Sequence, residues 1–245
     1  MVILYIFIAG LTVGSFLNAC IYRIPRGESM IVGFSHCPYC GRRIKAIDLV
    51  PMLSFFLLRG KCRTCRCRIS FRYPAVEFAL GLLFVILYMK YGTGILFIKY
   101  ALFVSVLILV GTIDYETGEV YTSTITFGVA AGGLFAALTQ GQGIDCILGA
   151  LTGFAVISAI ALTGGMGWGD ADICLLCGLF LGVRYTLLMI FISFIIGALA
   201  GLIMIALAGK RGKDTMAFGP YIAASAIITL FLGDNIFLHY INMIS

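Results

Sequence analysis

Apolar stretches long enough to cross a lipid bilayer run through most of this 245-residue chain, and they constrain its fold more than any other feature. A spanning helix needs about 20 mostly apolar residues, whereas a membrane β-barrel would show strands of about ten residues with alternating polarity. Charged residues make up 11% of the chain, against about 25% in a soluble domain. We therefore predict an all-α polytopic membrane protein with about eight transmembrane helices, at residues 2–22, 74–91, 95–113, 122–139, 144–164, 170–183, 185–208 and 217–237.

One long hydrophilic stretch interrupts this pattern and suggests a domain division. The apolar stretch before it lacks a basic leader segment and a small-x-small cleavage site, so we interpret it as a mature helix and not as a signal peptide. We expect a first transmembrane helix at 1–22, a cytoplasmic loop domain at 23–73 and a seven-helix membrane domain at 74–245. Small residues one turn apart predict close helix packing at five Gly-x-x-x-Gly pairs: Gly10/Gly14, Gly128/Gly132, Gly149/Gly153, Gly178/Gly182 and Gly197/Gly201.

The distribution of basic residues predicts the orientation. The loop at 23–73 holds 11 of the 17 Lys and Arg residues, and these residues accumulate on the cytoplasmic side of a membrane. The loop is therefore expected in the cytoplasm and the N-terminus outside. Eight spans then place the basic segment 209–216 on the inside as well, and they leave three basic residues outside: Lys90, Lys99 and Arg184.

Four cysteines in the loop have the spacing of a metal site. Cys37 and Cys40 form one C-x-x-C pair, and Cys62 and Cys65 form a second. Two such pairs supply the four sulfur ligands of a structural zinc ion, and cytoplasmic thiols stay reduced. A redox-active pair is the alternative, and Cys67 could replace Cys65, although the C-x-x-C spacing favours Cys65. The other cysteines are expected to act as small apolar residues: Cys20, Cys146, Cys174 and Cys177.

Two aspartates are predicted at the same membrane depth. Counting spans puts Asp114 at the cytoplasmic end of the third and Asp170 at the cytoplasmic start of the sixth. A carboxylate at the bilayer centre costs about 2.5–3.5 kcal/mol or more, and two adjacent carboxyls share one proton. One member can then activate water while the other polarises a peptide carbonyl, which is aspartic peptidase chemistry. Gly167 and Gly169 would let a substrate backbone approach. The alternative is a flexible turn in which Asp170 caps the next helix.

Seven sequence blocks, in this order, resemble the bacterial type IV prepilin leader peptidases and span nearly the whole chain: GSFLNACIYRIPRG (14–27), CPYCGRRI (37–44), LVPMLSFFLLRGKCRTC (49–65), ISFRYPAVE (69–77), IDYETGEVY (113–121), GGMGWGDADI (164–173) and FGPYIA (218–223). The resemblance implies an aspartic peptidase of the Gly-x-Gly-Asp class in the bacterial cytoplasmic membrane, with Asp114 and Asp170 as catalytic residues. Such enzymes cut the short basic leader from prepilins, pseudopilins or competence pilins after a glycine at the cytoplasmic face. Many also methylate the new N-terminus with S-adenosylmethionine, an activity associated with the N-terminal part and its cysteine-bearing loop.

The chain departs from the family pattern at two places. Val120-Tyr121 stands where the family usually has Ile-Pro, and Asp172 stands where it often has Lys. A third carboxylate would raise the local negative potential and could serve in place of Asp170. We prefer Asp170 because it completes Gly167-x-Gly169-Asp, and we interpret Asp172 as a solvated interfacial carboxylate.

Two other classes of protein fit parts of the sequence. A transporter or channel subunit would also be polytopic, with glycine-rich helices and intramembrane acids, although no internal symmetry is evident. A zinc-anchored membrane scaffold without catalysis is the second alternative. Nucleic-acid binding is not expected, since no binding module accompanies the basic loop. The sequence leaves open which pilin is cut, the oligomeric state, the residues that would bind S-adenosylmethionine and the route of substrate entry.

Overall fold

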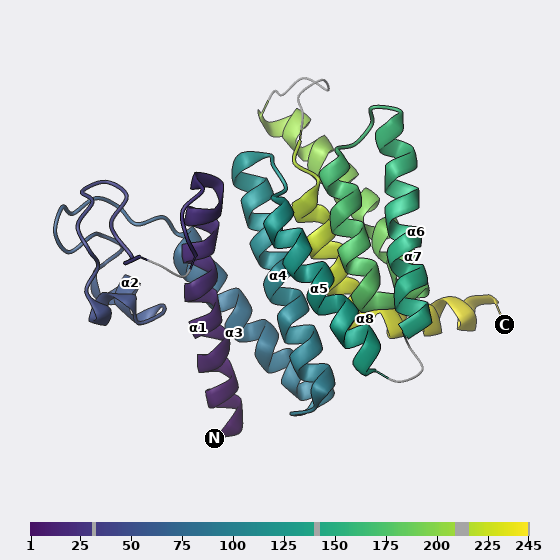
Figure 1. The fold of residues 1–245 in the computed structure, drawn as a ribbon, viewed down its shortest axis with the longest axis horizontal. Coiled ribbons are helices and arrows are strands. Elements are labelled where there is room, and N and C mark those ends of the chain that lie inside the picture. The colour runs from purple at the N-terminus through teal and green to yellow at the C-terminus, as the bar shows by residue number, and fades with distance from the viewer. Residues whose placement is uncertain (31–32, 140–142, 209–215, 245) are drawn as a thin grey trace. The chain divides into compact units, whose positions relative to one another are not determined.

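The computed structural model describes residues 1–30, 33–139, 143–208 and 216–244, and over these residues the regular structure is helical (Figure 1). The predicted all-α fold is confirmed. Positions Lys210, Arg211 and Lys213, which entered the orientation argument, lie outside the described residues. In chain order the elements are α1 (Val2–Arg23), the 3-10 turns η1 (Ile24–Arg26) and η2 (Ala46–Leu49), α2 (Leu53–Leu57), α3 (Arg72–Tyr91), α4 (Ile95–Thr117), α5 (Thr122–Leu138), α6 (Gly143–Leu162), α7 (Trp168–Ala208) and α8 (Gly219–Ile244).

Six of these helices are long and apolar enough to cross a membrane: α1, α3, α4, α6, α7 and α8. α5 is apolar but has 17 residues. α7 has 41 residues, about twice the length that one crossing needs. It covers the sixth and seventh predicted spans together.

α7 folds back on itself at Gly182, where the backbone has φ 77° and ψ 172°. A Cβ atom added to Gly153 of α6 would lie 2.7 Å from the carbonyl oxygen of Cys174 and 3.0 Å from Cγ2 of Thr186. In a straight helix these two residues would be about 18 Å apart, at 1.5 Å per residue. Figure 1 shows both ends of α7 at the same end of the helices. Its two arms therefore correspond to the two predicted spans, and the described residues contain eight apolar helical segments.

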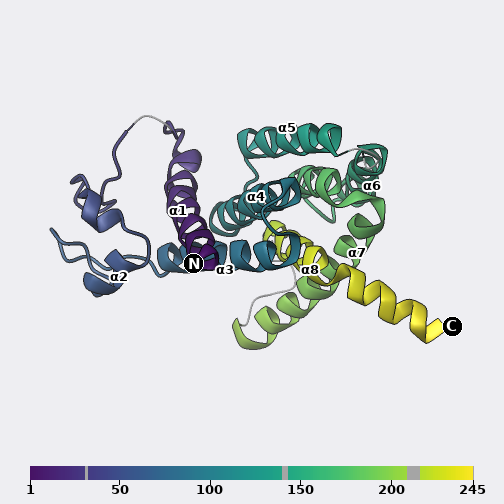
Figure 2. The same cartoon turned by 90° about the horizontal axis from the view of Figure 1, so that it is seen from below.

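The chain divides into two compact units, Met1–Leu109 and Val110–Ser245, with the boundary inside α4. In the second unit, α6 and α8 pack against α7, and α5 packs against α7 and α6 (Figure 2). Both aspartates of the predicted pair lie in this second unit. The cysteine-bearing loop belongs to the first.

α1 and α3 both belong to the first unit and pack closely through glycines. A Cβ atom on Gly10 would lie 2.6 Å from the carbonyl oxygen of Leu80, and one on Gly14 would lie 2.6 Å from the Cα of Glu77. The later residue of α1, Gly14, meets the earlier residue of α3, Glu77, so the two helices are antiparallel. The Gly-x-x-x-Gly prediction fits here, whereas no described atom lies within 4 Å of the Cβ position of Gly201.

The closest helix approach in the second unit gives a stability prediction. A Cβ atom on Gly178 would overlap the backbone of Gly149, so the α6 and α7 backbones touch directly. We expect Gly178→Ala to lower the free energy of unfolding by about 1–3 kcal/mol or more, because the helices must separate. Thermal unfolding of the purified protein measures this effect. Gly133→Ala is the matched control, because its Cβ would meet nothing within 4 Å, and an equal loss there would contradict the contact.

Candidate active site and metal centre

Asp114 is a buried carboxylate near the C-terminal end of α4, with 4% of its surface exposed. The carbonyl-rich end of its own helix disfavours a negative charge. α8 offsets this effect, because its first residue, Gly219, donates its backbone N–H to Oδ2 of Asp114 at 2.9 Å. The positive end of the α8 dipole thus lies against this carboxylate.

Asp170 is the third residue of α7 and is 8% exposed. Its Oδ2 accepts a hydrogen bond from the backbone N–H of Gly167 at 3.2 Å. This is the half of a capping box in which a third-position carboxylate reaches back to the residue before the helix. The side chain therefore does cap α7, as the alternative interpretation proposed, but from inside the first turn. The hydrogen bond from Gly167 uses only Oδ2 of Asp170, and Oδ1 takes no part in it.

The structure brings the two aspartates into one buried neighbourhood. A Cβ atom on Gly219 would lie 2.5 Å from Oδ2 of Asp114 and 3.0 Å from Cδ1 of Ile173. Ile173 is one helical turn after Asp170, so Asp114 faces the first turns of α7. Two residues 56 positions apart, each beside a helix N-terminus, thus lie in one neighbourhood of the second unit.

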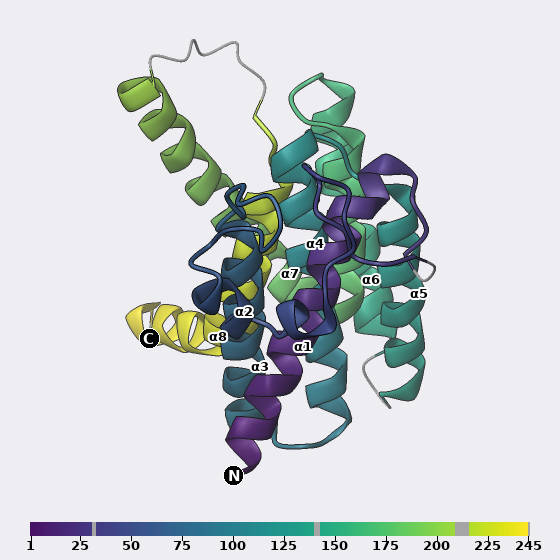
Figure 3. The same cartoon turned by 90° about the vertical axis from the view of Figure 1, so that its left-hand side faces the viewer.

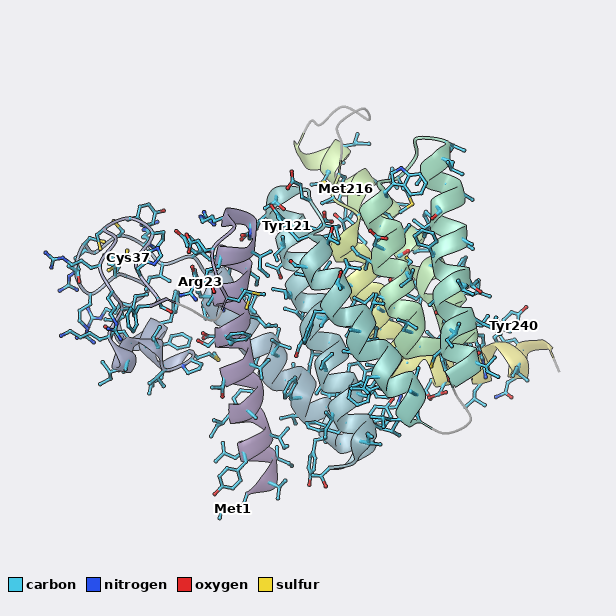
Figure 4. All side chains as sticks on the ribbon, in the orientation of Figure 1. Met1, Arg23, Cys37, Tyr121, Met216 and Tyr240 are labelled. Carbon is cyan, nitrogen blue, oxygen red and sulfur yellow. The ribbon has the colours of Figure 1, made fainter. Side chains whose placement is uncertain are left out.

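The four predicted zinc ligands also come together. The Sγ atoms of Cys37, Cys40, Cys62 and Cys65 all lie within 4.8 Å of one another, and those of Cys37 and Cys65 are 3.8 Å apart. Tetrahedral Zn–S bonds of about 2.3 Å require sulfurs about 3.8 Å apart, so the residues present fit zinc. The group contains Cys65 and not Cys67. Figure 4 shows Cys37 in the loop with sulfur atoms around it.

The two C-x-x-C segments are built alike. Cys37 N–H donates to the carbonyl of Arg42, and Cys62 N–H donates to the carbonyl of Cys67, each five residues later. The residue four positions after the first cysteine is left-handed in both, with φ 67° at Gly41 and φ 60° at Arg66. Glycine adopts this conformation freely, whereas Arg66 adopts it at a cost. The repeated turn brings the two sulfurs of each C-x-x-C pair close together.

Charge and hydrogen bonding support the second segment. Both Nε and Nη2 of Arg63 donate to the Asp48 carboxylate, at distances of 2.6 to 3.2 Å, which ties η2 to the segment between the two cysteines. The Arg63 guanidinium lowers the pKa of the Asp48 carboxyl. The backbone N–H groups of Cys65 and Thr64 lower the pKa of the Cys62 thiol to about 7. Thiolate is the form that binds metal, so these donors favour the ligand role.

Comparison with known proteins identifies the family. The Bacterial Peptidase A24 N-terminal domain matches residues 8–91, and the Type IV leader peptidase family matches residues 101–202. A Prepilin leader peptidase/N-methyltransferase of Bacillus subtilis (strain 168) is 34% identical over 243 residues, which cover 97% of each chain. The chain belongs to the prepilin leader peptidase/N-methyltransferase family. The protein of that name from Aeromonas salmonicida (strain A449) is 30% identical over 98% of this chain and 94% of its own length. The one from Neisseria gonorrhoeae is 30% identical over 94% of this chain and 90% of its own length. No solved structure matches.

Membership of this family, together with the apolar helices, makes the chain a multi-pass membrane protein. It also favours a peptidase with an associated methyltransferase over a transporter, channel subunit or scaffold. Asp114, Asp170 and the glycines around Asp170 lie in the part matched by the Type IV leader peptidase family. The four clustered cysteines lie in the part matched by the N-terminal domain.

The two departures from the prepilin peptidase pattern have different structural surroundings. Val120 packs against the motif itself, because a Cβ atom on Gly169 would lie 2.7 Å from both Cβ and Cγ2 of Val120. A side chain at position 169 would collide with Val120 in the α4–α5 connection, so glycine is required there. Asp172 is exposed, whereas its neighbours Ala171 and Ile173 are buried. Its interpretation as a solvated interfacial carboxylate stays a prediction.

Gly219 is a site residue that the sequence analysis did not assign. The block FGPYIA places a glycine and a proline at the start of a helix, a position typical of proline, but nothing in it indicates which carboxylate the helix would meet. We expect Gly219→Ala to slow leader cleavage by about 10²-fold, because an added Cβ would displace the Asp114 carboxyl from its hydrogen bond. Initial cleavage rates measure the effect, with Gly133→Ala as control. Cleavage at the unsubstituted rate would contradict the Asp114 geometry.

Proposed function

We propose that this protein is a membrane-embedded aspartic endopeptidase that removes the leader of type IV prepilin-like proteins after a glycine, at the cytoplasmic face, and then N-methylates the new N-terminus. The observation that carries the proposal is that Asp114 and Asp170 are both buried around the first turns of α7, in a chain that belongs to the prepilin leader peptidase family. Prepilins, pseudopilins and competence pilins are the proposed substrates.

The catalytic step follows from two adjacent carboxyls that share one proton. The ionised member takes a proton from a water molecule, which attacks the scissile carbonyl while the protonated member donates a hydrogen bond to the carbonyl oxygen. The tetrahedral intermediate then collapses, the C–N bond breaks, and an aspartate donates a proton to the leaving amine. Asp114 and Asp170 are the proposed pair. Gly167 is proposed to leave room for the substrate backbone beside Asp170, whereas Val120 occupies the space at Gly169.

Two groups are proposed as cofactors. Zinc bound by Cys37, Cys40, Cys62 and Cys65 would hold the loop in its folded form, with no part in peptide cleavage. S-adenosylmethionine would supply the methyl group. No glycine-rich strand–turn–helix occurs among the described residues, and we assign no residues to it.

The proposed location is the bacterial cytoplasmic membrane, with the N-terminus outside and the dyad at the cytoplasmic face. The support is the positive-inside distribution, since residues 23–73 join α1 to α3 and hold most of the basic residues. We propose 1–22 as the first membrane helix, 23–73 as the zinc-binding loop and 74–245 as the peptidase part.

The protein reconstituted in liposomes with a purified prepilin tests the proposed function. We expect the leader to be lost and mass spectrometry to find a new N-terminus directly after a glycine, whereas empty liposomes leave the prepilin intact. Labelled S-adenosylmethionine should then transfer its label to that N-terminus. An intact prepilin would contradict the peptidase, and a processed but unlabelled product would contradict only the methyltransferase.

A further inference from the structure

The cysteine-bearing loop exposes a group of large apolar side chains that the peptidase mechanism does not use. Leu53, Phe56 and Leu57 of α2 and Phe71 before α3 are each more than half exposed. The Phe55 ring contacts the rings of both Phe56 and Phe71, with centroids 5.9 and 6.3 Å away, so Phe55 links Phe71 to the exposed residues of α2. We call Leu53, Phe56, Leu57 and Phe71 the α2 patch. Contiguous exposed apolar groups of this kind mark an interaction surface.

A hydrogen bond to a membrane helix fixes the depth of the α2 patch. The backbone N–H of Met52, the residue directly before α2, donates to Oε2 of Glu77 at 2.7 Å. Glu77 lies in the second turn of α3, and its Cα packs against Gly14 of α1. α2 therefore begins beside two membrane-spanning helices and not beyond their ends. Figures 1 and 3 both show α2 alongside α1 and α3.

The charge of the loop indicates what covers the patch. Residues 23–73 contain 11 Lys and Arg but only two acidic residues, Glu28 and Asp48. Given the proposed function, the leader of the substrate is itself basic and would be repelled. Lipid phosphates attract such a loop, and apolar side chains beside basic ones are typical of elements that lie in the membrane interface.

We propose that the α2 patch inserts into the boundary between headgroups and acyl chains of the same bilayer that α1 and α3 cross. The basic residues of the loop then lie over the lipid phosphates, and the zinc-binding segments are held against the membrane surface. The occupant of this surface is lipid. Because the α2 patch is anchored at the level of α3 by the Met52–Glu77 bond, insertion requires no change of fold.

Photo-crosslinking of the full-length protein in liposomes tests this proposal. p-Benzoylphenylalanine would replace Phe56 in the α2 patch, Tyr39 in the first C-x-x-C segment as an exposed loop control, and Phe191 in α7 as an exposed membrane-helix control. Liposomes of phosphatidylcholine, with or without phosphatidylglycerol, supply the lipid, and mass spectrometry identifies the adducts. We expect lipid adducts at position 56 to approach the yield at position 191, to exceed that at position 39 several-fold, and to increase with phosphatidylglycerol.

Two outcomes would overturn the proposal. Lipid adducts at position 56 that are no more frequent than at position 39 would show that the α2 patch does not enter the bilayer. With prepilin added, peptide adducts at position 56 that replace the lipid adducts would assign the surface to substrate. Crosslinking requires no catalysis, so either result can be distinguished from failure of the proposed peptidase activity.

Discussion

Replacing either Asp114 or Asp170 with asparagine is expected to reduce leader cleavage by about 10⁴-fold. Asparagine keeps nearly the same shape, and its carbonyl oxygen can still accept the N–H of Gly219 or Gly167. It cannot take a proton from water or pass one to the leaving amine. The loss would therefore come from chemistry and not from unfolding. Single-turnover cleavage of a purified prepilin by reconstituted protein measures it.

Asp172→Asn is the matched control, because Asp172 is two positions from Asp170 but is exposed. Its cleavage rate should stay close to that of the unsubstituted protein. If cleavage instead survives in Asp170→Asn and is lost in Asp172→Asn, the second catalytic carboxylate is Asp172 and our assignment is wrong.

Loss of a zinc ligand is expected to unfold the cysteine-bearing loop. Structural zinc contributes an apparent binding free energy of about 10–16 kcal/mol at neutral pH, far more than this short loop can gain from its exposed apolar residues. Cys37→Ser and Cys62→Ser should each abolish bound zinc, and the many arginines of the loop should become sites of rapid trypsin cleavage. Methyl transfer should be lost with the fold of the loop.

Cys67→Ser provides the control for this experiment, because Cys67 is in the same segment but outside the four-sulfur group. It should keep one zinc ion per chain and the trypsin resistance of the unsubstituted protein. Metal analysis of the unsubstituted protein that finds no zinc, or full zinc in Cys62→Ser, would contradict the assigned ligands.

The sequence predicted the features that depend on local pattern. Apolar length identified the membrane helices, and the two predicted spans on either side of Gly182 match the two arms of α7, although the first arm is shorter than a full crossing. C-x-x-C spacing identified the cysteines that the structure clusters, since two residues between the members of each pair suit one metal ion. Counting spans predicted Asp114 and Asp170 at one membrane depth, and this depth stays a prediction.

Contacts between distant segments could not be predicted in the same way. The bond from Gly219 to Asp114 joins residues 105 positions apart, and membrane depth does not specify which helix is the neighbour. The contact of Val120 with Gly169 depends on how the α4–α5 connection meets α7. The position of α2 beside α3 follows from the hydrogen bond between Met52 and Glu77. The sequence of α2 indicates only a short apolar segment.

Cleavage by the double variant Asp114→Asn/Asp170→Asn, compared with both single variants in the same single-turnover assay, tests most directly whether the two carboxylates act as one catalytic unit. Groups that work as a unit are strongly non-additive, so the double variant should retain about the same residual rate as each single variant. If the two losses multiply, or if either single variant cleaves at the unsubstituted rate, Asp114 and Asp170 do not form a shared-proton dyad.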